Sequence, residues 1–418
     1  MKKLTRSFLI LTMMILFSVG SIGNNKSACI TIEPSINRNS TNALAYSDHS
    51  PILIDGNADF MFQAVTESWS GDGTQGNPIT ISGYRIADEG IQCLRLWNVD
   101  LHWKVSDCLF EGGAPSEFSG IWLTNVSNGE FVNNIIRDRD AGIDTYEGVH
   151  NCVFSGNQIC NNTQQGIVVL NGMFNSSITG NIFSGNLAHN IWVAGGLNDT
   201  IISDNTITGG QYGVRVNLCT RVTVQGNTFT NTSLEAVMLP LGSEIIISDN
   251  TIVGTQTGGI ATCGVNSEII ENRITDAAGI GIYLASGDSV LISDNTVTNS
   301  SDYALKLSVN TSNVTITDNI FIDNNDGDCQ VEDNGEDNQF SYNHYNDWLS
   351  PDANSDNIVD IAYAIDGDAS NTDQFPVVDP NATTPPGGQL DLPSLLPYVA
   401  VGAVAVLLAI GVALIKRK

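Results

Sequence analysis

Ile202-Ser203-Asp204-Asn205-Thr206-Ile207 decides the fold, because close copies of this stretch recur along most of the chain. In each copy a central asparagine has an apolar residue three positions before it and an apolar or aromatic residue two positions after it. Successive asparagines are 22 to 24 residues apart: Asn134, Asn157, Asn181, Asn205, Asn227, Asn250, Asn272, Asn295, Asn319 and Asn343. A period this constant is typical of a solenoid.

A third apolar run begins eight or nine residues after the asparagine, as in Gly166-Ile167-Val168-Val169 and Gly213-Val214-Arg215-Val216. Apolar and polar residues alternate in most of these runs, which is the pattern of a strand with one buried face. The gaps are too short and too rich in Gly, Asn, Ser and Asp for helices. We therefore predict an all-β, right-handed parallel β-helix of about 11 coils of about 23 residues. A leucine-rich repeat needs a Leu-x-x-Leu-x-Leu core, which is missing.

Stacking explains the repeated asparagine. Equivalent residues in neighbouring coils are expected to lie about 4.8 Å apart. Their side-chain amides can then form a ladder and satisfy buried backbone groups of the turns. Asparagine also tolerates the left-handed backbone conformation that a sharp corner requires.

The composition restricts the partners and the cysteine chemistry. The 418 residues carry a formal net charge of −28 and include only 17 Lys plus Arg. Such a surface repels phosphates, so a nucleic-acid partner is not expected. The eight cysteines form no Cys-x-x-Cys motif; Cys152 could pair with Cys160 across one corner, and Cys93 with Cys108 across neighbouring strands. The others are at least as well explained as small buried apolar residues.

The N-terminal part differs from the repeats. Residues 1–23, with a basic start and an apolar run, are predicted to be a signal peptide, and residues 24–46 a disordered leader. Residues 47–78 are predicted to cap the open end of the coils with a helix over Phe60–Trp69, in which Phe60, Ala64 and Val65 share one side. The coils themselves are expected over residues 79–345.

The C-terminal part predicts a membrane anchor. Residues 346–380 are expected to form a second cap, and residues 381–394 a flexible linker. Residues 395–415 are apolar enough for a transmembrane helix, and the basic residues 416–418 are expected to stay in the cytoplasm. The β-helix would then face outward from the cell membrane as a single-pass surface protein. Glycosylation sequons agree with secretion: Asn125, Asn161, Asn175, Asn198, Asn231, Asn299 and Asn313.

A family resemblance lies in the segments at the two ends of the coils. The C-terminal segment contains Asn343, Asp347-Trp348, Pro351-Asp352, Asp356, Ile358, Asp360, Ile365-Asp366-Gly367 and Phe375-Pro376, and the N-terminal one is Ile54-Asp55-Gly56-Asn57-Ala58-Asp59-Phe60. With the asparagine coils, they resemble the NosD-like family and secreted archaeal β-helix proteins of the pectin-lyase-like fold. The resemblance covers roughly residues 50–380. It implies the fold, and it leaves open polysaccharide binding, polysaccharide cleavage and copper-site maturation.

The outward side of the third strand is the predicted binding surface. The residue after the inward-facing aliphatic gives a ladder of Trp122, Asp144, Val168, Trp192, Arg215, Met238, Ala261, Tyr283 and Lys306. Sugars stack on aromatic rings, while carboxylates and arginines bind their hydroxyl groups. We predict that Trp122, Asp144, Trp192, Arg215 and Tyr283 bind an extracellular glycan or surface-layer polysaccharide. Arg215 is expected to make a cation–π contact with Trp192.

Catalysis is the alternative to binding. Asp138, Asp140 and Asp144, with His150 beyond them, are the candidate catalytic residues of a polysaccharide lyase or hydrolase. A solvated acidic turn has the same composition, and the motifs of β-helix polygalacturonases are missing, so the interpretation leans toward binding. Copper delivery is disfavoured because the five histidines are spread over separate coils.

Calcium is the cofactor that the sequence predicts. One segment resembles the ligand spacing of an EF-hand loop, with positions 1, 3, 5, 7 and 9 occupied by Asp352, Asn354, Asp356, the Ile358 carbonyl and Asp360. The match is incomplete, since Asn357 replaces the turn glycine and Tyr363 stands where a bidentate glutamate belongs.

Overall fold

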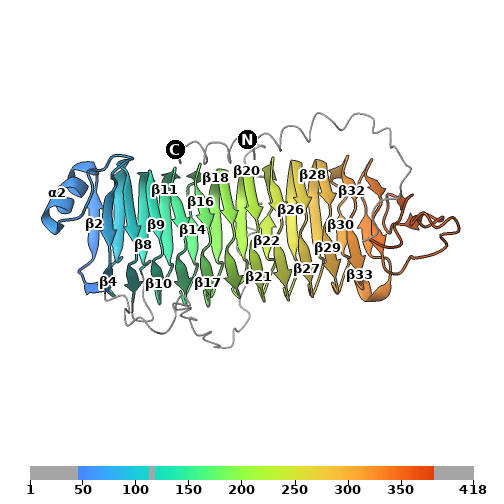
Figure 1. The fold of residues 1–418 in the computed structure, drawn as a ribbon, viewed down its shortest axis with the longest axis horizontal. Coiled ribbons are helices and arrows are strands. Elements are labelled where there is room, and N and C mark those ends of the chain that lie inside the picture. Colours follow the sequence, from blue (N-terminus) through green and yellow to red (C-terminus); the bar gives the residue numbers. More distant parts are fainter. Residues whose placement is uncertain (1–45, 113–117, 381–418) are drawn as a thin grey trace, which may run out of the picture.

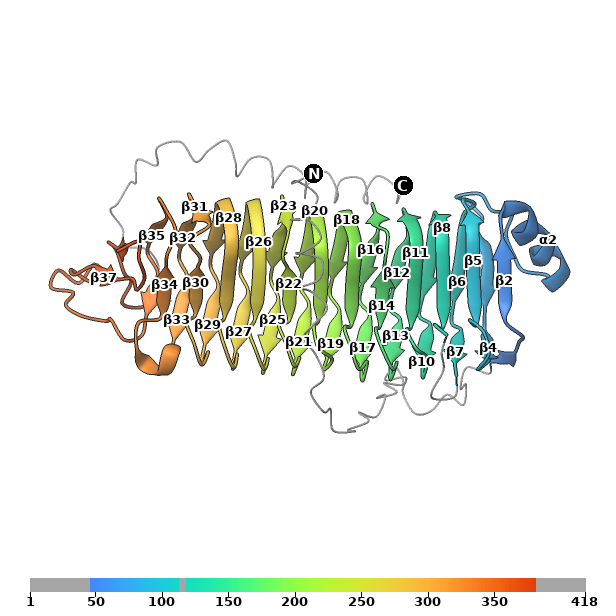
Figure 2. The same ribbon diagram turned by 180° about the vertical axis from the view of Figure 1, so that it is seen from behind.

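The computed structural model describes residues 46–112 and 118–380, which form a parallel β-helix of about 11 turns. The chain winds along one long axis from the N-terminal to the C-terminal end (Figures 1 and 2). The strands of each coil pair with the equivalent strands of the next; β17 (Ile182–Ser184), for example, pairs in parallel with β19 (Thr206–Thr208). The exception is β37 near the C-terminal end, which pairs antiparallel with β38. The predicted all-β solenoid is confirmed.

One sheet collects the strands that follow the central asparagine. In the described residues it has 13 strands. They are β1 (Ser47–Asp48), β4 (Tyr84–Ala87), β7 (Leu109–Glu111), β10 (Ile135–Arg137), β13 (Gln158–Cys160), β17 (Ile182–Ser184), β19 (Thr206–Thr208), β21 (Thr228–Thr230), β25 (Thr251–Val253), β27 (Arg273–Thr275), β29 (Thr296–Thr298), β33 (Ile320–Ile322) and β36 (His344–Tyr345).

The second sheet collects the third strands and the strands before the asparagine, and in several coils the two are one long bent strand. Its strands in the described residues are β2 (Ile52–Asp55), β3 (Ile79–Ser82), β5 (Leu94–Val99), β6 (Trp103–Ser106), β8 (Ile121–Ser127), β9 (Gly129–Val132), β11 (Ile143–His150), β12 (Val153–Ser155), β14 (Ile167–Val169), β15 (Met173–Phe174), β16 (Ser177–Thr179), β18 (Ile191–Ser203), β20 (Val214–Gln225), β22 (Val237–Leu239), β23 (Gly242–Ser243), β24 (Ile246–Ser248), β26 (Ile260–Ile270), β28 (Ile282–Ser293), β30 (Leu305–Leu307), β31 (Thr311–Ser312), β32 (Thr315–Thr317), β34 (Val331–Asp333), β35 (Gln339–Ser341), β37 (Tyr363–Ala364) and β38 (Thr372–Asp373).

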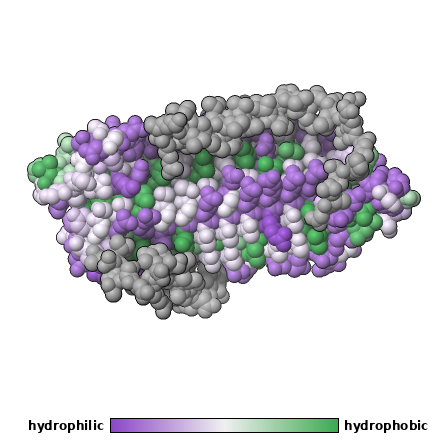
Figure 3. Space-filling view, in the orientation of Figure 1, coloured by the Kyte–Doolittle hydropathy of each residue, from purple (hydrophilic) through white to green (hydrophobic). Residues whose placement is uncertain are grey.

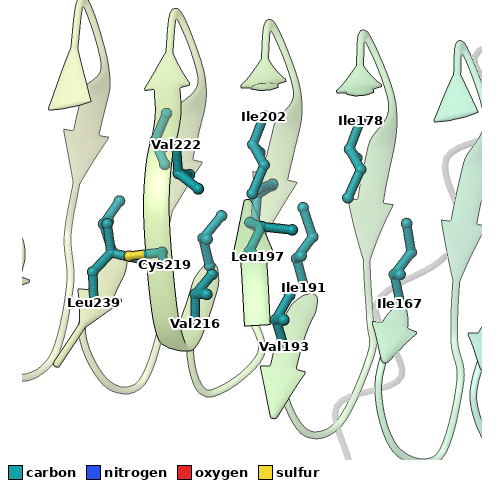
Figure 4. Close-up of a cluster of buried hydrophobic side chains, with 14 of the residues drawn as sticks. Ile167, Ile178, Ile191, Val193, Leu197, Ile202, Val216, Cys219, Val222 and Leu239 are labelled. Carbon is teal, nitrogen blue, oxygen red and sulfur yellow. The ribbon is translucent and has the colours of Figure 1, made fainter. Parts of the chain in front are cut away.

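The core runs along the axis of the solenoid. The repeated apolar positions on either side of each asparagine are buried, as Ile202 and Ile207 show with no exposed surface. Figure 4 shows side chains of this kind gathered between the strands of successive coils, among them Ile191, Val193 and Val216. On the visible outer face hydrophobic residues form only small separate patches among neutral and hydrophilic ones (Figure 3).

The asparagine ladder forms as predicted, but the left-handed conformation that we expected of the asparagine belongs to the residue before it, as in Asp204, whose φ is 56°. Oδ1 of Asn205 accepts hydrogen bonds from the backbone N and from Nδ2 of Asn181, at 2.9 and 3.0 Å. Nδ2 of Asn205 donates to the Ile178 carbonyl and to Oδ1 of Asn227, both at 2.9 Å. The pattern continues from coil to coil up to Asn343, and the ten asparagines are at most 1% exposed. Each amide thus satisfies buried backbone groups on both sides of its corner.

The N-terminal helix differs in detail from the prediction. Helix α2 spans Asn57–Glu67 rather than Phe60–Trp69, and Ser68 ends it in the left-handed conformation. Phe60 and Ala64 are buried in the core cluster, but Val65 is 79% exposed, so its predicted burial is wrong. The apolar side is narrower than expected because it contacts little beyond β2 and β5. Figure 1 shows α2 at the N-terminal end of the stack.

The coils also begin before residue 79. β1 pairs in parallel with β4, and β2 pairs in parallel with β5. The two short strands β1 and β2 lie in the segment that we expected to be a cap. They were not predicted because they are short and the asparagine motif is missing there.

Neither of the two cysteine pairings that the sequence left open forms. Cys160 is disulfide-bonded, whereas Cys152 is a buried free thiol, and both Cys93 and Cys108 are buried free thiols. Burial raises the pKa of Cys152 to about 12, so this thiol stays protonated and inert at neutral pH. These three buried thiols therefore serve as small apolar core residues.

The membrane and signal segments lie outside the described part of the chain. None of the helices in residues 46–112 and 118–380 has the length and apolar character needed to cross a membrane. The predicted signal peptide, leader, linker, transmembrane helix at 395–415 and cytoplasmic tail at 416–418 stay predictions.

Candidate functional site

The predicted outward ladder is present in register. Trp122 is the partner of Asp144, and the pairing continues one residue per coil through Val168, Trp192, Arg215, Met238, Ala261, Tyr283 and Lys306. It extends to Arg95 before Trp122 and to Glu332 after Lys306. We call the residues from Arg95 to Glu332 in this register the ladder face. Apart from the buried Val168 and Ala261, its members are half-buried.

At the N-terminal part of the ladder face, Trp122 is held by its own strand and the next. Its Nε1 donates to Oγ1 of Thr124 at 2.9 Å, and its ring stacks against Tyr146 with a centroid distance of 6.2 Å. Tyr146 is 47% exposed. This part of the face therefore offers two neighbouring aromatic rings, one of which was not predicted.

Asp144 lies beside Trp122 and has an unusual carboxyl. Its Oδ1 is buried without a hydrogen-bond partner. Burial, and then the charge of Asp140, raises the pKa of Asp144 to about 6. Asp140 itself accepts a hydrogen bond from Thr163 at 3.2 Å. A carboxyl of this kind can hold or release a proton near neutral pH.

The other predicted catalytic residues do not join Asp144 in one constellation. Asp138 turns outward in a left-handed corner and pairs with Arg137 at 3.7 Å. His150 stands at the opposite end of β11 from Asp144, where its ring stacks on Phe174 with centroids 4.8 Å apart. The structure thus brings together Asp140 and Asp144 but separates His150 from them, because a strand carries its two ends apart.

Further along the ladder face, Trp192 and Arg215 have three neighbours that were not predicted from the sequence. His189, Tyr212 and Glu235 each stand three positions before a ladder residue, and they follow one another coil by coil. Backbone hydrogen bonds from Asn190 to the Tyr212 carbonyl and from Gly213 to the Glu235 carbonyl fix this order. We call His189, Trp192, Tyr212, Arg215 and Glu235 the Arg215 cluster.

Ring contacts organise the Arg215 cluster. The guanidinium carbon of Arg215 lies 5.0 Å from the centre of the Tyr212 ring, so the cation–π partner is Tyr212 and the prediction of Trp192 is wrong. His189 makes edge-to-face contacts with Tyr212 at 5.0 Å and with Trp192 at 5.7 Å.

Burial shifts the titrating groups of the Arg215 cluster toward their neutral forms. It lowers the pKa of His189 to about 4, with a second contribution from the positive charge of Arg215. It raises the pKa of Glu235, which the charge of Arg215 partly opposes. Burial also raises the pKa of Tyr212, and the nearby Glu235 adds to this. At neutral pH His189 is uncharged, and Arg215 is the fixed cation of the cluster.

Three polar atoms of the Arg215 cluster are buried without a hydrogen-bond partner. They are Nδ1 of His189, Nε1 of Trp192 and Nε of Arg215. Buried polar groups are normally paired, so three in one small cluster require an explanation. Because these atoms have almost no exposed surface, a ligand could pair with them only after their side chains move.

In the C-terminal part of the ladder face the charged side chains pair with one another. Lys306 forms an ion pair with Glu332 and lies 5.4 Å from the centre of the Tyr303 ring. Tyr283 is the register neighbour of Lys306, but Met238 and Ala261 separate it from Arg215. The structure therefore does not bring Tyr283 together with the tryptophans.

Two surface hollows lie away from the ladder face. One, of about 450 Å³, is lined mainly by asparagines and includes Asp100 and His150. The other, of about 400 Å³, is lined by Asn198, Leu218, Leu241 and their neighbours. Neither contains a residue of the Arg215 cluster.

The predicted calcium segment is a tight acidic turn. Asp352 accepts hydrogen bonds from the backbone N of Asp356 and of Asn357, both at 3.2 Å. Asp356 accepts from the N of Ile358 at 3.0 Å, and Asp360 accepts from the N of Ala353 at 2.7 Å. These carboxylates thus already hold the turn, and calcium binding by Asp352, Asn354, Asp356, Ile358 and Asp360 stays a prediction.

The histidines do not gather into a donor set for copper. In residues 46–112 and 118–380 no three His, Cys, Asp or Glu side chains are grouped so that they could hold a metal ion. His49 and His344 each pair with a backbone carbonyl, while His150 and His189 contact aromatic rings. The described residues do not fit the copper role that the family resemblance implies.

Solved structures with this architecture include two polysaccharide-cleaving enzymes and a tailspike protein. The catalytic unit of a GH87 α-1,3-glucanase from Streptomyces thermodiastaticus is 14% identical with a TM-score of 0.50, covering 71% of this chain and 66% of that one. The Dettilon tailspike protein is 12% identical with a TM-score of 0.48, over 71% and 66%. An alginate lyase from Paenibacillus is 11% identical with a TM-score of 0.42, over 69% and 98%. This chain spans less than two thirds of the first two, and these likenesses concern the fold alone.

No curated protein matches the sequence. A family model does: the model described as periplasmic copper-binding protein (NosD) matches residues 37–237 and 197–367, which is most of the chain. The matched residues include the asparagine coils and the β-strands that carry the ladder face. The chain therefore belongs to the NosD family of β-helix proteins.

Proposed function

We propose that this protein binds a polysaccharide along the ladder face, with Trp122, Asp144, Trp192 and Arg215 in contact with the sugar chain. The Arg215 cluster is the centre of the site, and the Trp122–Tyr146 ring pair extends it toward the N-terminal coils. Tyr283 is a peripheral member, since two coils separate it from Arg215.

One observation carries this proposal: the half-buried Trp192 ring lies in register with Arg215, whose guanidinium lies over the Tyr212 ring and has no carboxylate within 4.0 Å in the described residues. Sugars present hydroxyl oxygens at their edges and C–H groups on their faces, and a ring beside an unpaired arginine suits both.

The dimensions favour a chain over a single sugar. Trp122 and Trp192 are three coils apart in register, which corresponds to about 14 Å. Because the coils are stacked in one direction, the ladder face is straight, and an extended oligosaccharide could contact both tryptophans at once.

Binding of the full-length protein to a panel of immobilised neutral and acidic polysaccharides tests the proposal. We expect at least one polymer to be retained and to change the tryptophan fluorescence on titration. The double variant Trp122→Ala with Trp192→Ala should lose this binding while it keeps its melting temperature within a few degrees. If the double variant binds as well as the parent protein, the ladder face is not the site.

Cleavage of the polysaccharide is the second function to consider, because Asp144 has a pKa of about 6 and lies beside Trp122. A carboxyl with this pKa can serve as a general acid or base. Release of reducing ends, or absorbance from unsaturated products, would reveal cleavage. Asp144→Asn should abolish it without loss of binding, and an absence of products from every polymer that is bound leaves a binding protein.

We propose in addition that the β-helix lies outside the cell, anchored by residues 395–415, with α2 closing the N-terminal end of its core. The apolar run before a basic terminus supports the anchor, and burial of Phe60 supports the closing role of α2. Protease digestion of intact cells tests the first part, since the described coils should be cleaved from outside.

A further inference from the structure

Arg215 differs from the arginines that form ion pairs elsewhere on the coils. Arg221 pairs with Asp199 at 2.6 Å, and both Arg85 and Arg137 pair with Glu111 at 2.7 Å. Within the described residues Arg215 has no carboxylate within 4.0 Å, and its Nε has no hydrogen-bond partner. A half-buried guanidinium without an anion is costly to keep, especially in a chain with 45 acidic residues that could have paired with it.

The position of Arg215 is fixed by its neighbours. Its guanidinium lies over the Tyr212 ring, and Tyr212 in turn contacts His189 edge to face. The Cα of Arg215 is in register with that of Trp192 in the coil before. A guanidinium held over a ring keeps its planar set of N–H donors pre-organised, and this set matches the two oxygens of a carboxylate.

The charges around Arg215 favour an anion locally. From Arg95 to Tyr283 the ladder face carries two arginines and one carboxyl, Asp144, whose pKa is raised to about 6. Burial favours the protonated form of Glu235, the nearest acid in the cluster. Charges more than about 8 Å away are largely screened at physiological salt. The net charge of −28 on the whole chain therefore does not prevent an anion from binding at Arg215.

We propose that the Arg215 cluster is a subsite for the carboxylate of a uronic-acid residue, so that the polysaccharide bound by the ladder face is a polyuronate. The inference rests on the proposed binding function and names its ligand class. Arg215 receives the carboxylate through its terminal N–H groups, and the Trp192 ring stacks on the sugar face. His189 packs against Trp192 and Tyr212 and adds no charge of its own at neutral pH.

The test compares acidic polymers with their neutral counterparts. The full-length protein is titrated by calorimetry with polygalacturonate, alginate and hyaluronate, each beside its methyl-esterified form, in about 0.15 M salt. A charge-assisted hydrogen bond corresponds to roughly a tenfold or larger preference for the acid form of at least one polymer. Equal affinity for acid and ester in all three pairs would show the inference to be wrong.

Variants identify the residue responsible. Arg215→Gln should abolish the preference for the acid form, and Arg215→Lys should restore part of it, since lysine supplies the charge but not the planar fork. Arg221→Gln is the matched control, because Arg221 is on the same strand β20, exposed, and paired with Asp199. It should leave the preference unchanged. If Arg215→Gln keeps the preference, or Arg221→Gln loses it to the same degree, the carboxylate does not bind at Arg215.

The outcomes separate this inference from the function on which it rests. Binding to esters and neutral glucans that is lost in Trp192→Ala, with no preference for acids, supports polysaccharide binding and contradicts the uronate subsite. A stronger, Arg215-dependent affinity for dextran sulfate than for any carboxylate polymer contradicts the ligand class. No binding to any polymer contradicts both proposals.

Discussion

Asn343 donates two hydrogen bonds to Oδ2 of Asp373, from its backbone N at 3.1 Å and from its side-chain Nδ2 at 2.9 Å. These are the bonds that every earlier asparagine makes with the next one, so the ladder ends on an aspartate that takes the place of an eleventh amide. Tyr345 also donates to Oδ2 of Asp373, at 3.3 Å. A residue from outside the repeats thus completes the last corner.

The first prediction follows from this contact. Asp373→Ala leaves the two donors of Asn343 and the Tyr345 hydroxyl buried without a partner, and we expect a loss of about 1–3 kcal/mol of unfolding free energy. Asp368→Ala, at an exposed position in the same segment, is the control and should change little. Chemical denaturation measures both. Equal small effects would mean that the end of the ladder needs no acceptor.

The second prediction concerns the middle of the ladder. Asn205→Ala removes an acceptor for Asn181 and a donor to the Ile178 carbonyl, so it should also cost about 1–3 kcal/mol. The adjacent Thr206 is exposed, and Thr206→Ala should cost only a few tenths. Should both substitutions prove equally mild, the amide ladder contributes little to stability.

The third prediction separates binding from folding at Trp192. Trp192→Ala should weaken polysaccharide binding by roughly 1–2 kcal/mol, because the stacking surface is lost. The melting temperature should change by only a few degrees, since the ring is half-buried and lies outside the core. Leu218→Ala, which removes a side chain that is 53% exposed on β20, should affect neither quantity. Unfolding of Trp192→Ala would identify the indole as a core residue.

The fourth prediction is a dependence of stability on pH. His189 protonates near pH 6.5 in the unfolded chain but only near pH 4 in the folded protein. Between these values the unfolded state binds the extra proton, so the stabilising contribution of neutral His189 is full above pH 6.5 and is lost as the pH falls. His189→Gln should therefore lose less stability than the parent protein between pH 7 and pH 5, by on the order of 2 kcal/mol.

Thermal unfolding at several pH values measures this difference. His102→Gln, at a half-buried position in an earlier coil, is the control and should follow the parent protein. A His189→Gln curve that is parallel to the parent curve would show that His189 titrates normally.

The fifth prediction concerns calcium at the acidic turn. If Asp352 and Asp356 bind the ion, millimolar calcium should raise the melting temperature of the full-length protein. The double variant Asp352→Asn with Asp356→Asn should lose this rise, while Asp368→Asn keeps it. An unchanged melting temperature in the parent protein would leave these carboxylates with the single role of holding the turn.

The repeats could be predicted from the sequence because one residue type carries one structural role in every coil. Asn205 and Ile207 recur at fixed spacing, and that spacing determines strand register, burial and the outward ladder together. The first short strands escaped prediction, since Ser47–Asp48 and Ile52–Asp55 pair with later strands without the asparagine motif. Two or four residues carry too little pattern to be identified alone.

The Arg215 cluster could be predicted only in part. Trp192 and Arg215 belong to the third strand, whose alternation shows which residues face outward. His189, Tyr212 and Glu235 lie in turns, where no alternation indicates direction. Their common position, three residues before a ladder residue, was the available signal. The partner of Arg215 could not be derived, because the position of the Tyr212 ring depends on packing between coils rather than on sequence spacing.

The nearest-neighbour bonding of the asparagines has a consequence for how proteins of this build can differ in length. Among the ladder asparagines, Asn205 forms hydrogen bonds only with Asn181 and Asn227. The ladder therefore links each coil only to the two coils next to it. Removal of one full period from the regular middle would place equivalent donors and acceptors against each other again. The two ends would be unaffected. The separation between Trp122 and the Arg215 cluster can therefore change only in steps of about 4.8 Å. The length of the proposed binding surface is thus set by the number of coils that the gene encodes between them.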